Sequence, residues 1–208
     1  MKNSQPTTKG RLLVIEGIDG TGKTTVVAEL VALLRDQGYD VVASREPTDG
    51  PWGQKIRGLY TKGRESITPE EEVQWFLNDR LEHVAQVIRP ALESGNLVVL
   101  DRYYHSTVAY QGARGGDVQT LFQRNLDIAP EPDLTIILDL TLDEALRRVQ
   151  EFRGDVADSF EQRDELAKVQ RIYDSMQGEN IKHLEAGGTP AEVCKKVWYS
   201  VANYLEAV

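Results

Sequence analysis

Residues Gly17 to Thr24 match in full the pattern G-x-x-x-x-G-K-[ST], in which the backbone N–H groups of a loop bind a polyphosphate. Glycines let such a loop curl around the anion, and the dipole of a following helix adds to the attraction. Lys23 would reach the β- and γ-phosphates, and the hydroxyl of Thr24 would hold Mg²⁺. The sequence therefore predicts nucleoside triphosphate binding, by Gly17, Asp19, Gly20, Thr21, Gly22, Lys23, Thr24 and Thr25.

This motif lies between a predicted strand and a predicted helix, as its mechanism requires. The apolar run Leu12–Ile15 precedes it and is short enough for a buried strand. Apolar residues then recur at helical spacing over residues 23–36, and Gly38 follows as a helix stop. The context favours a phosphate loop over the alternative, a glycine-rich turn without a ligand.

Two more polar groups follow predicted strands. Asp101 and Arg102 come directly after the apolar run Leu97–Leu100. A carboxylate there is placed to hold Mg²⁺, and the planar guanidinium of Arg102 suits a phosphate; a structural ion pair is the alternative. Arg45, after the run Tyr39–Ala43, is another candidate phosphate ligand, for which a solvated surface arginine is the simpler explanation when it is taken alone.

A predicted long helix over residues 69–94 carries a possible base-binding pair. Phe76 and Arg80 are four residues apart and therefore share a helix face. An aromatic ring and an arginine on one face can stack on a base and hydrogen-bond to it. A core helix with a charged edge is the alternative.

A polar, weakly periodic stretch separates two later helical segments and is predicted to be a lid, over about 148–163. Phosphoryl transfer depends on charge neutralisation and alignment, which arginines on a closing segment supply. A solvated helix face is the alternative for each of these arginines: Arg147, Arg148, Arg153 and Arg163.

The order of apolar runs and helical stretches predicts an α/β fold, a three-layer P-loop NTPase architecture with a five-stranded parallel sheet. The predicted strands are Leu12–Ile15, Tyr39–Ala43, Leu97–Leu100, Leu134–Leu138 and Ile181–Leu184. The predicted helices cover about 23–36, 52–61, 69–94, 117–128, 142–152, 160–176 and 190–206. We expect a disordered lead-in over residues 1–10 and a single domain over 11–208. Ligands of such sheets bind beyond the carboxyl ends of the strands, where these motifs converge.

Composition limits the classes of partner. Of 208 residues, 24 are Lys or Arg and 33 are Asp or Glu, a formal charge of -9, so we expect no nucleic-acid polymer as a ligand. No apolar stretch approaches the roughly 20 residues of a membrane span, and we recognise no secretory signal. The one cysteine, Cys194, excludes an internal disulfide. We expect a cytoplasmic protein with no membrane partner.

Taken together, these residues resemble the thymidylate kinase family, over nearly the whole chain from Arg11. The most specific part is the run from Asp101-Arg102-Tyr103 through Ser106 to Ala109-Tyr110-Gln111. The resemblance implies ATP as the phosphate donor, dTMP as the acceptor, Mg²⁺ as the cofactor and a homodimer that pairs through long helices. By analogy it also implies a cis peptide before Pro47.

The resemblance further assigns roles to individual residues at the acceptor site. Arg45 and Arg102 would bind the acceptor phosphate, and Asp19 would contact the sugar 3′-hydroxyl and the metal shell. Phe76 would stack on thymine and Arg80 would bond a base carbonyl. The remaining implied acceptor residues are Thr107, on the base; Tyr110, against a ribose 2′-hydroxyl; and Ser106 and Gln111, within the signature run.

The family divides by whether its catalytic arginine lies in the phosphate loop or in the lid. Gly20 and Thr21 follow Asp19, so this chain resembles the lid-arginine type, with Arg148 and Arg153 as catalytic candidates beside Lys23 and Arg102. Two segments depart from the family pattern. Ser159 stands where family lids often carry an arginine, and residues 48–52 replace a stretch that is glycine-rich in many relatives.

We therefore expect an enzyme that phosphorylates dTMP to dTDP with ATP and Mg²⁺. One alternative is a kinase for another acceptor, such as dUMP, since residues 48–52 differ. A second is a P-loop ATPase without a small-molecule acceptor, and a third is an inactive phosphate-loop scaffold, which only Ser159 suggests.

Overall fold

The structure is a computed structural model that describes residues 9–153 and 159–207, without the side chains of residues 62, 152, 153 and 159–162. The predicted lead-in therefore lies outside the described residues, apart from residues 9 and 10, and so does the centre of the predicted lid. The five strands form one parallel sheet in the order β2-β3-β1-β4-β5. They are β1 (Arg11–Glu16), β2 (Val41–Arg45), β3 (Leu97–Asp101), β4 (Leu134–Asp139) and β5 (Ile181–Glu185).

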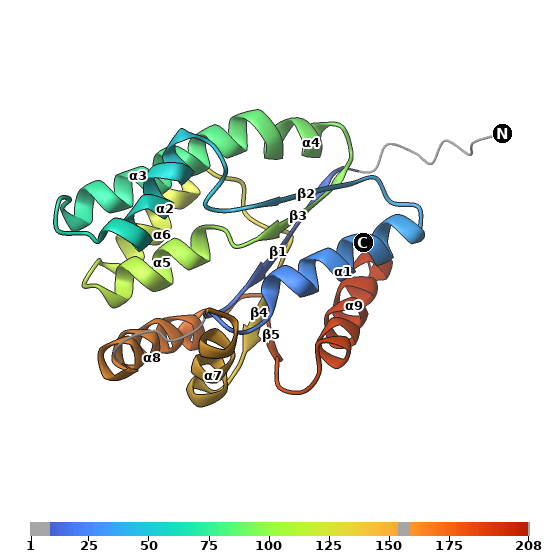
Figure 1. The fold of residues 1–208 in the computed structure, drawn as a ribbon. Coiled ribbons are helices and arrows are strands. Elements are labelled where there is room, and N and C mark those ends of the chain that lie inside the picture. Colours follow the sequence, from blue (N-terminus) through green and yellow to red (C-terminus); the bar gives the residue numbers. More distant parts are fainter. Residues whose placement is uncertain (1–8, 154–158, 208) are drawn as a thin grey trace.

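Helices cover both faces of this sheet (Figure 1). They are α1 (Lys23–Asp36), α2 (Pro51–Lys62), α3 (Pro69–His83), the π-helical turn η1 (Val84–Ile88), α4 (Arg89–Glu93), α5 (Tyr104–Ala113), α6 (Val118–Leu126), α7 (Leu142–Arg153), α8 (Ser159–Ser175) and α9 (Pro190–Ala207). α1 and α9 pack together on one face, and η1 and α4 lie on the other. The predicted α/β class is confirmed. None of the described helices is long and apolar enough to cross a membrane.

Alternation along β1 explains how one strand serves both faces. Leu13 and Ile15 belong to the core cluster that includes α1 and α9, whereas Leu12 and Val14 belong to the cluster that includes η1 and α4. Successive side chains of a strand point to opposite faces, so a wholly apolar strand is buried on both sides. This central position fixes the phosphate loop that follows Glu16.

The helix α5 was not predicted, because the run after Asp101 was interpreted only as a motif. The predicted helix over 69–94 is interrupted by η1, just ahead of Pro90. Proline has no N–H to donate one turn back, so a wider turn accompanies it. The strand β2 begins two residues later than predicted, since the N–H of Tyr39 still donates to the carbonyl of Leu34 at the end of α1.

Two glycines of the phosphate loop have nearly the same φ but different surroundings. Gly20 and Gly22 have φ of 88° and 86°, in the left-handed region that favours glycine. A Cβ on Gly20 would lie 2.4 Å from the carbonyl oxygen of Ala145 in α7, whereas a Cβ on Gly22 would meet nothing within 4 Å. The loop is therefore packed against α7 at Gly20 and open at Gly22.

We expect Gly20→Ala to be more destabilising than Gly22→Ala. Both variants bear the cost of a left-handed alanine, about 1–2 kcal/mol, but only Gly20→Ala also pushes a methyl group into backbone. Urea unfolding should show a clearly lower free energy of unfolding for Gly20→Ala. Equal losses in the two variants would show that the contact with Ala145 does not restrain the loop.

His105 is a buried titratable group of α5. Its ring stacks on Tyr104, with centroids 4.3 Å apart, and meets the edge of Phe122. Its Nδ1 atom has no hydrogen-bond partner among the described residues. Burial, and to a lesser degree the charge of Arg80, lowers the pKa of His105 to about 3, so the folded protein holds a neutral imidazole.

This burial predicts a loss of stability in acid. Below the ordinary histidine pKa of about 6.5 the unfolded chain binds a proton that the folded chain does not, so unfolding becomes easier as pH falls. Between pH 7 and pH 5 this group should cost about 2 kcal/mol. Urea unfolding at pH 7 and at pH 5 should show that the free energy of unfolding falls less in His105→Gln than in the wild-type chain. Equal pH dependence in both would contradict the assignment.

Candidate active site

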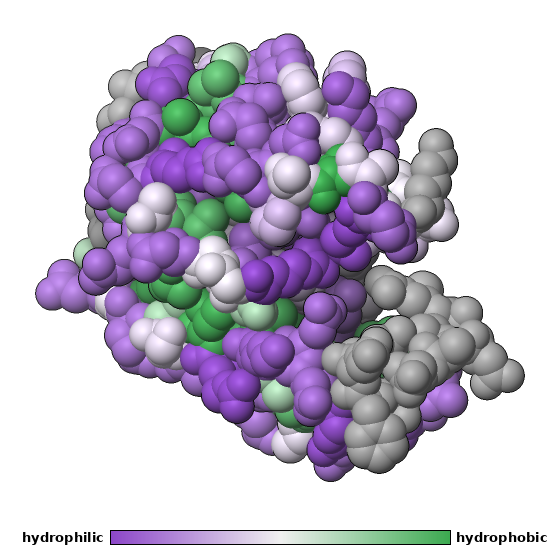
Figure 2. Space-filling view, turned by 90° about the vertical axis from the view of Figure 1, so that its left-hand side faces the viewer, coloured by the Kyte–Doolittle hydropathy of each residue, from purple (hydrophilic) through white to green (hydrophobic). Residues whose placement is uncertain are grey.

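The loops at the carboxyl ends of the parallel strands bring the predicted motifs to one end of the molecule. Ile15 of β1 and Arg45 of β2 are both in register with Asp101 of β3. The phosphate loop, the Arg45 segment and the run after Asp101 therefore start side by side. Figure 2 looks onto this end, where mostly hydrophilic residues border a hollow in the surface.

The phosphate loop is shaped by its own polar contacts. Lys23 is buried, and its ammonium donates to the carbonyl oxygen of Ile18 at 2.7 Å. Thr21 donates to the same carbonyl at 3.0 Å. Burial and, to a lesser degree, the charge of Arg102 lower the pKa of Lys23 to about 7, against the opposing charge of Asp19. A phosphate beside this ammonium would add negative charge and so favour its protonated form.

Thr24 and Asp101 form a possible magnesium site. The hydroxyl of Thr24 donates to Oδ2 of Asp101 at 2.7 Å, across 77 residues of sequence. A hydroxyl and a carboxylate are hard oxygen ligands, of the kind that Mg²⁺ takes together with substrate phosphates. Within the described residues no group of three or more His, Cys, Asp or Glu could hold a metal alone. The residues thus fit a metal bound mainly by a nucleotide.

Arg102 links the phosphate loop to α5. It is the only described residue other than glycine with a positive φ, 70°. Its guanidinium donates to the carbonyl of Gly17 at 3.2 Å and to the hydroxyl of Ser106 at 3.0 Å, and it pairs with Asp19. The ring of Tyr110 lies 5.5 Å from it, and burial raises the pKa of that tyrosine to about 12. Arg102 is thus oriented by four residues.

Arg80 lies at the centre of a buried polar network. It is 1% exposed, pairs with Glu46 and Asn125, and donates to the hydroxyl of Thr107 at 3.2 Å. Burial raises the pKa of Glu46, but Arg80 and a hydrogen bond from His83 more than offset this, so the pKa lies below its usual range. The structure brings Arg80 and Thr107 together as the predicted base-binding site requires.

Phe76 lies one turn before Arg80 on α3 and is partly exposed. It belongs to neither hydrophobic core cluster of the described residues. A partly exposed ring outside the core, beside a buried arginine, fits a stacking surface better than the alternative of core packing.

Arg45 has a different environment. It is 61% exposed on its side chain and donates to Asp49 at 2.9 Å, in the segment that departs from the family pattern. Arg57 holds the same segment through the carbonyls of Pro47 and Thr48. The peptide between Glu46 and Pro47 is cis, as the resemblance implied.

Gln111, the last predicted acceptor residue, lies in a separate cluster. Its amide donates to Oε1 of Glu72 at 3.2 Å, and Arg64 and Arg114 donate to the same buried oxygen. The contact joins α5 to α3 beside the acceptor residues. Nothing in this contact shows Gln111 meeting a ligand directly.

Three of the predicted lid arginines, Arg147, Arg148 and Arg163, have described side chains, and the partners that the structure describes for them lie outside the phosphate loop. Arg148 donates to Glu144 and to the carbonyls of Ala186 and Gly188. Arg147 pairs with Glu144 and Glu151. The side chain of Arg153, like that of Ser159, lies outside the described residues, and Arg163 pairs with Asp143. Which of these arginines is catalytic stays a prediction.

Several buried polar residues at the site were missed by the sequence reasoning. They are Glu16, Glu46, Glu72, Asn125 and Tyr173. Each has side-chain hydrogen-bond partners between 34 and 157 residues away, and Glu72 and Asn125 also have a nearer one, Arg64 and Leu121, so local spacing does not mark them. Glu16 precedes the phosphate loop and Glu46 follows Arg45, and adjacency to the motifs was the only available signal.

Comparison with known proteins agrees with this geometry. A family model described as "Thymidylate kinase" matches residues 15–197. The thymidylate kinase of Desulfotalea psychrophila is 47% identical over 197 residues, which cover 95% of this chain and 96% of that protein. Those of Brachyspira hyodysenteriae and Akkermansia muciniphila are 40% and 43% identical, over 91% of this chain and 92% and 90% of their own lengths. The chain belongs to the thymidylate kinase family.

Proposed function

We propose that this chain transfers the γ-phosphoryl group of ATP to dTMP, with Mg²⁺, and forms dTDP and ADP. The observation that carries the proposal is the junction between the phosphate loop and the run after β3, where Thr24 meets Asp101 and Asp19 meets Arg102. A donor phosphate on the loop and an acceptor phosphate on Arg102 would then be neighbours. Membership in the family supports the same reaction. The expected location is the cytoplasm.

In this proposal the donor end uses the loop amides and Lys23 to hold the β- and γ-phosphates. Thr24 and Asp101 would hold Mg²⁺, which when bound neutralises charge on the phosphates. An oxygen of the acceptor phosphate attacks the γ-phosphorus, and the bond from that phosphorus to the ADP oxygen breaks. The attacking phosphate is already anionic, so no general base is needed. Arg148 and Arg153 are the candidates for additional positive charge.

The acceptor end would use residues from β2, α3, α5 and the loops that follow β1 and β3. Arg102 and Arg45 would hold the phosphate, and Asp19 the sugar 3′-hydroxyl. Phe76 would stack on the base. Arg80 and Thr107 would bind the base, and Tyr110 would lie against a 2′-hydroxyl. Ser106 and Gln111 complete the proposed acceptor site.

A panel of nucleoside monophosphates in a coupled ADP-release assay tests the proposal. We expect dTMP to give the highest kcat/KM, and Lys23→Met and Arg102→Ala to lower turnover by orders of magnitude, about 10²-fold or more, because each removes charge stabilisation from the transferring group. Arg171→Ala, on the exposed side of α8, is a control for lost charge and should retain activity.

The other outcomes of this panel identify the alternatives. A higher kcat/KM with dUMP would identify a kinase for that acceptor instead of dTMP. ATP hydrolysis without stimulation by any monophosphate would indicate an ATPase. Near-wild-type turnover in Lys23→Met or Arg102→Ala would contradict the assigned roles.

We also propose that the chain forms a homodimer through α3 and α6. Arg80 of α3 contacts Asn125 of α6, so the next residues along the chain, Leu81 and Leu126, lie on adjoining helices. Both leucines are exposed, Leu81 by 51% and Leu126 by 43%. Large apolar side chains exposed on adjoining helices favour burial against a partner.

Light scattering coupled to gel filtration tests the dimer. Leu81→Glu should shift the chain to the monomer mass, because it places a charge in the proposed interface. Tyr199→Glu changes an exposed apolar residue of α9 instead and should leave the mass unchanged. A wild-type monomer, or a dimer retained in Leu81→Glu, would exclude this interface.

A further inference from the structure

Glu16 is a buried carboxylate at the end of β1, immediately before the phosphate loop, and four hydrogen bonds converge on it. The N–H groups of Tyr103 and Ser106 donate to Oε1 at 2.8 and 3.1 Å. The hydroxyls of Ser106 and Tyr173 donate to Oε2 at 2.7 and 2.8 Å. Burial raises the pKa of Glu16, against the opposing charge of Arg102 and these hydrogen bonds. Four donors on two oxygens suit the ionised carboxylate.

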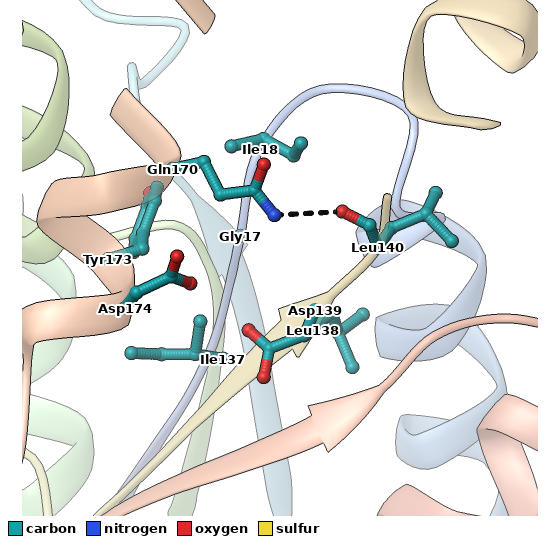
Figure 3. Close-up of a pocket in the computed structure, with 9 residues that line it drawn as sticks. All are labelled: Gly17, Ile18, Ile137, Leu138, Asp139, Leu140, Gln170, Tyr173 and Asp174. Atoms are coloured by element: carbon teal, nitrogen blue, oxygen red, sulfur yellow. Dashed lines mark hydrogen bonds between the residues drawn. The ribbon is translucent and has the colours of Figure 1, made fainter. Parts of the chain in front are cut away.

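Tyr173 contributes to this cluster from α8. Its side chain is wholly buried and lines a small pocket behind the phosphate loop with Gly17 and Ile18 (Figure 3). Its hydroxyl lies 2.8 Å from Glu16 and 2.9 Å from Ser106. Burial raises the pKa of Tyr173 well above its ordinary value, so this hydroxyl keeps its proton as a donor.

The hydroxyl of Ser106 connects this cluster to Arg102. A serine hydroxyl has one proton and two acceptor positions. Its proton goes to Glu16, which leaves a lone pair to accept from Arg102, while the Tyr173 hydroxyl, whose own proton also goes to Glu16, lies 2.9 Å from the Ser106 oxygen. A carboxylate fixed on both oxygens therefore decides which way the Ser106 hydroxyl faces. That direction in turn fixes one nitrogen of the Arg102 guanidinium.

We propose that Tyr173 is a positioning residue that acts through Glu16 and Ser106 to orient Arg102 toward the acceptor phosphate. The inference rests on the proposed function, in which Arg102 holds that phosphate. Without the Tyr173 hydroxyl, Oε2 of Glu16 loses a donor and the Ser106 hydroxyl loses a neighbour that restricts its rotation. Arg102 then lacks one fixed acceptor and binds the phosphate less well.

Binding of dTMP and of thymidine, measured by calorimetry, separates this role from a structural one. Thymidine lacks the phosphate that Arg102 would hold. Tyr173→Phe should weaken dTMP binding about tenfold, the loss of roughly one hydrogen bond to a charged group, and change thymidine binding less than about twofold. Phenylalanine keeps the buried ring, so circular dichroism should match that of the wild-type chain.

Gln170→Met is the matched control on the same helix. Gln170 lies one turn before Tyr173, lines the same pocket, and donates to the carbonyl of Leu140 at 3.0 Å without touching Glu16 (Figure 3). The substitution Gln170→Met removes this hydrogen bond, which is a different link between α8 and the segment after β4. We expect both ligands to bind Gln170→Met as they bind the wild-type chain. An equal selective loss in Gln170→Met would show that loosening α8 is sufficient and would overturn the inference.

A double-mutant cycle with Ser106→Ala tests the path itself. If Tyr173 acts through Ser106, Tyr173→Phe should change dTMP binding less than about twofold once Ser106 is alanine. Additive losses, or equal weakening of dTMP and thymidine in Tyr173→Phe, would overturn the inference. If Tyr173→Phe did not fold, Ser106→Ala must show the same phosphate-selective loss. A wild-type chain that binds neither compound would instead show that the proposed function itself has failed.

Discussion

The register between β1 and β3 is the constraint on which the rest of the site depends. Ile15 lies opposite Asp101, and the N–H of Arg102 donates to the carbonyl of Ile15 at 3.0 Å. Both strands are buried on two faces, and a slip of one residue would move each apolar side chain to the opposite face and into the other core cluster. The hydrophobic core therefore fixes, at no cost to the site, the distance between the phosphate loop and the acceptor run.

Beyond this junction, the segments that follow β1 and β3 each turn in a way that their own sequence dictates. After β1 the left-handed glycines of the phosphate loop lead into α1, whose first residue is the buried Lys23. After β3 the left-handed Arg102 turns the chain into α5. A positive φ in a residue with a side chain is uncommon and costs about 1 kcal/mol or more. Contacts with Gly17, Asp19 and Ser106 hold Arg102 in that conformation.

Much of this arrangement could be predicted from the sequence because it depends on local patterns. Apolar runs marked all five strands, and a complete motif marked the phosphate loop. The helix α5 was missed because its chemistry-bearing residues, such as Ser106 and Tyr110, obscured its helical spacing. Buried partners such as Glu16 and Asn125 could not be predicted, since a buried carboxylate or amide is explained only by donors from distant elements.

The carboxylates that pair with the cations of the site differ in how readily a phosphate could replace them. Arg45 and Asp49 are both mostly exposed, and such a pair contributes at most about 1 kcal/mol, so an incoming phosphate can take over Arg45 at little cost. Glu46 and Arg80 are both buried, and separating them would leave an uncompensated charge in the core. In the proposed function Arg80 would therefore serve as a fixed donor, while Arg45 would exchange its partner. Arg102 is intermediate: its pair with Asp19 is half-buried, and Ser106 and Gly17 keep its direction when the carboxylate moves away. In a chain of net charge -9, Arg45 and Arg102 would thus be the cations available to an anionic substrate, whereas Arg80 keeps its partner Glu46.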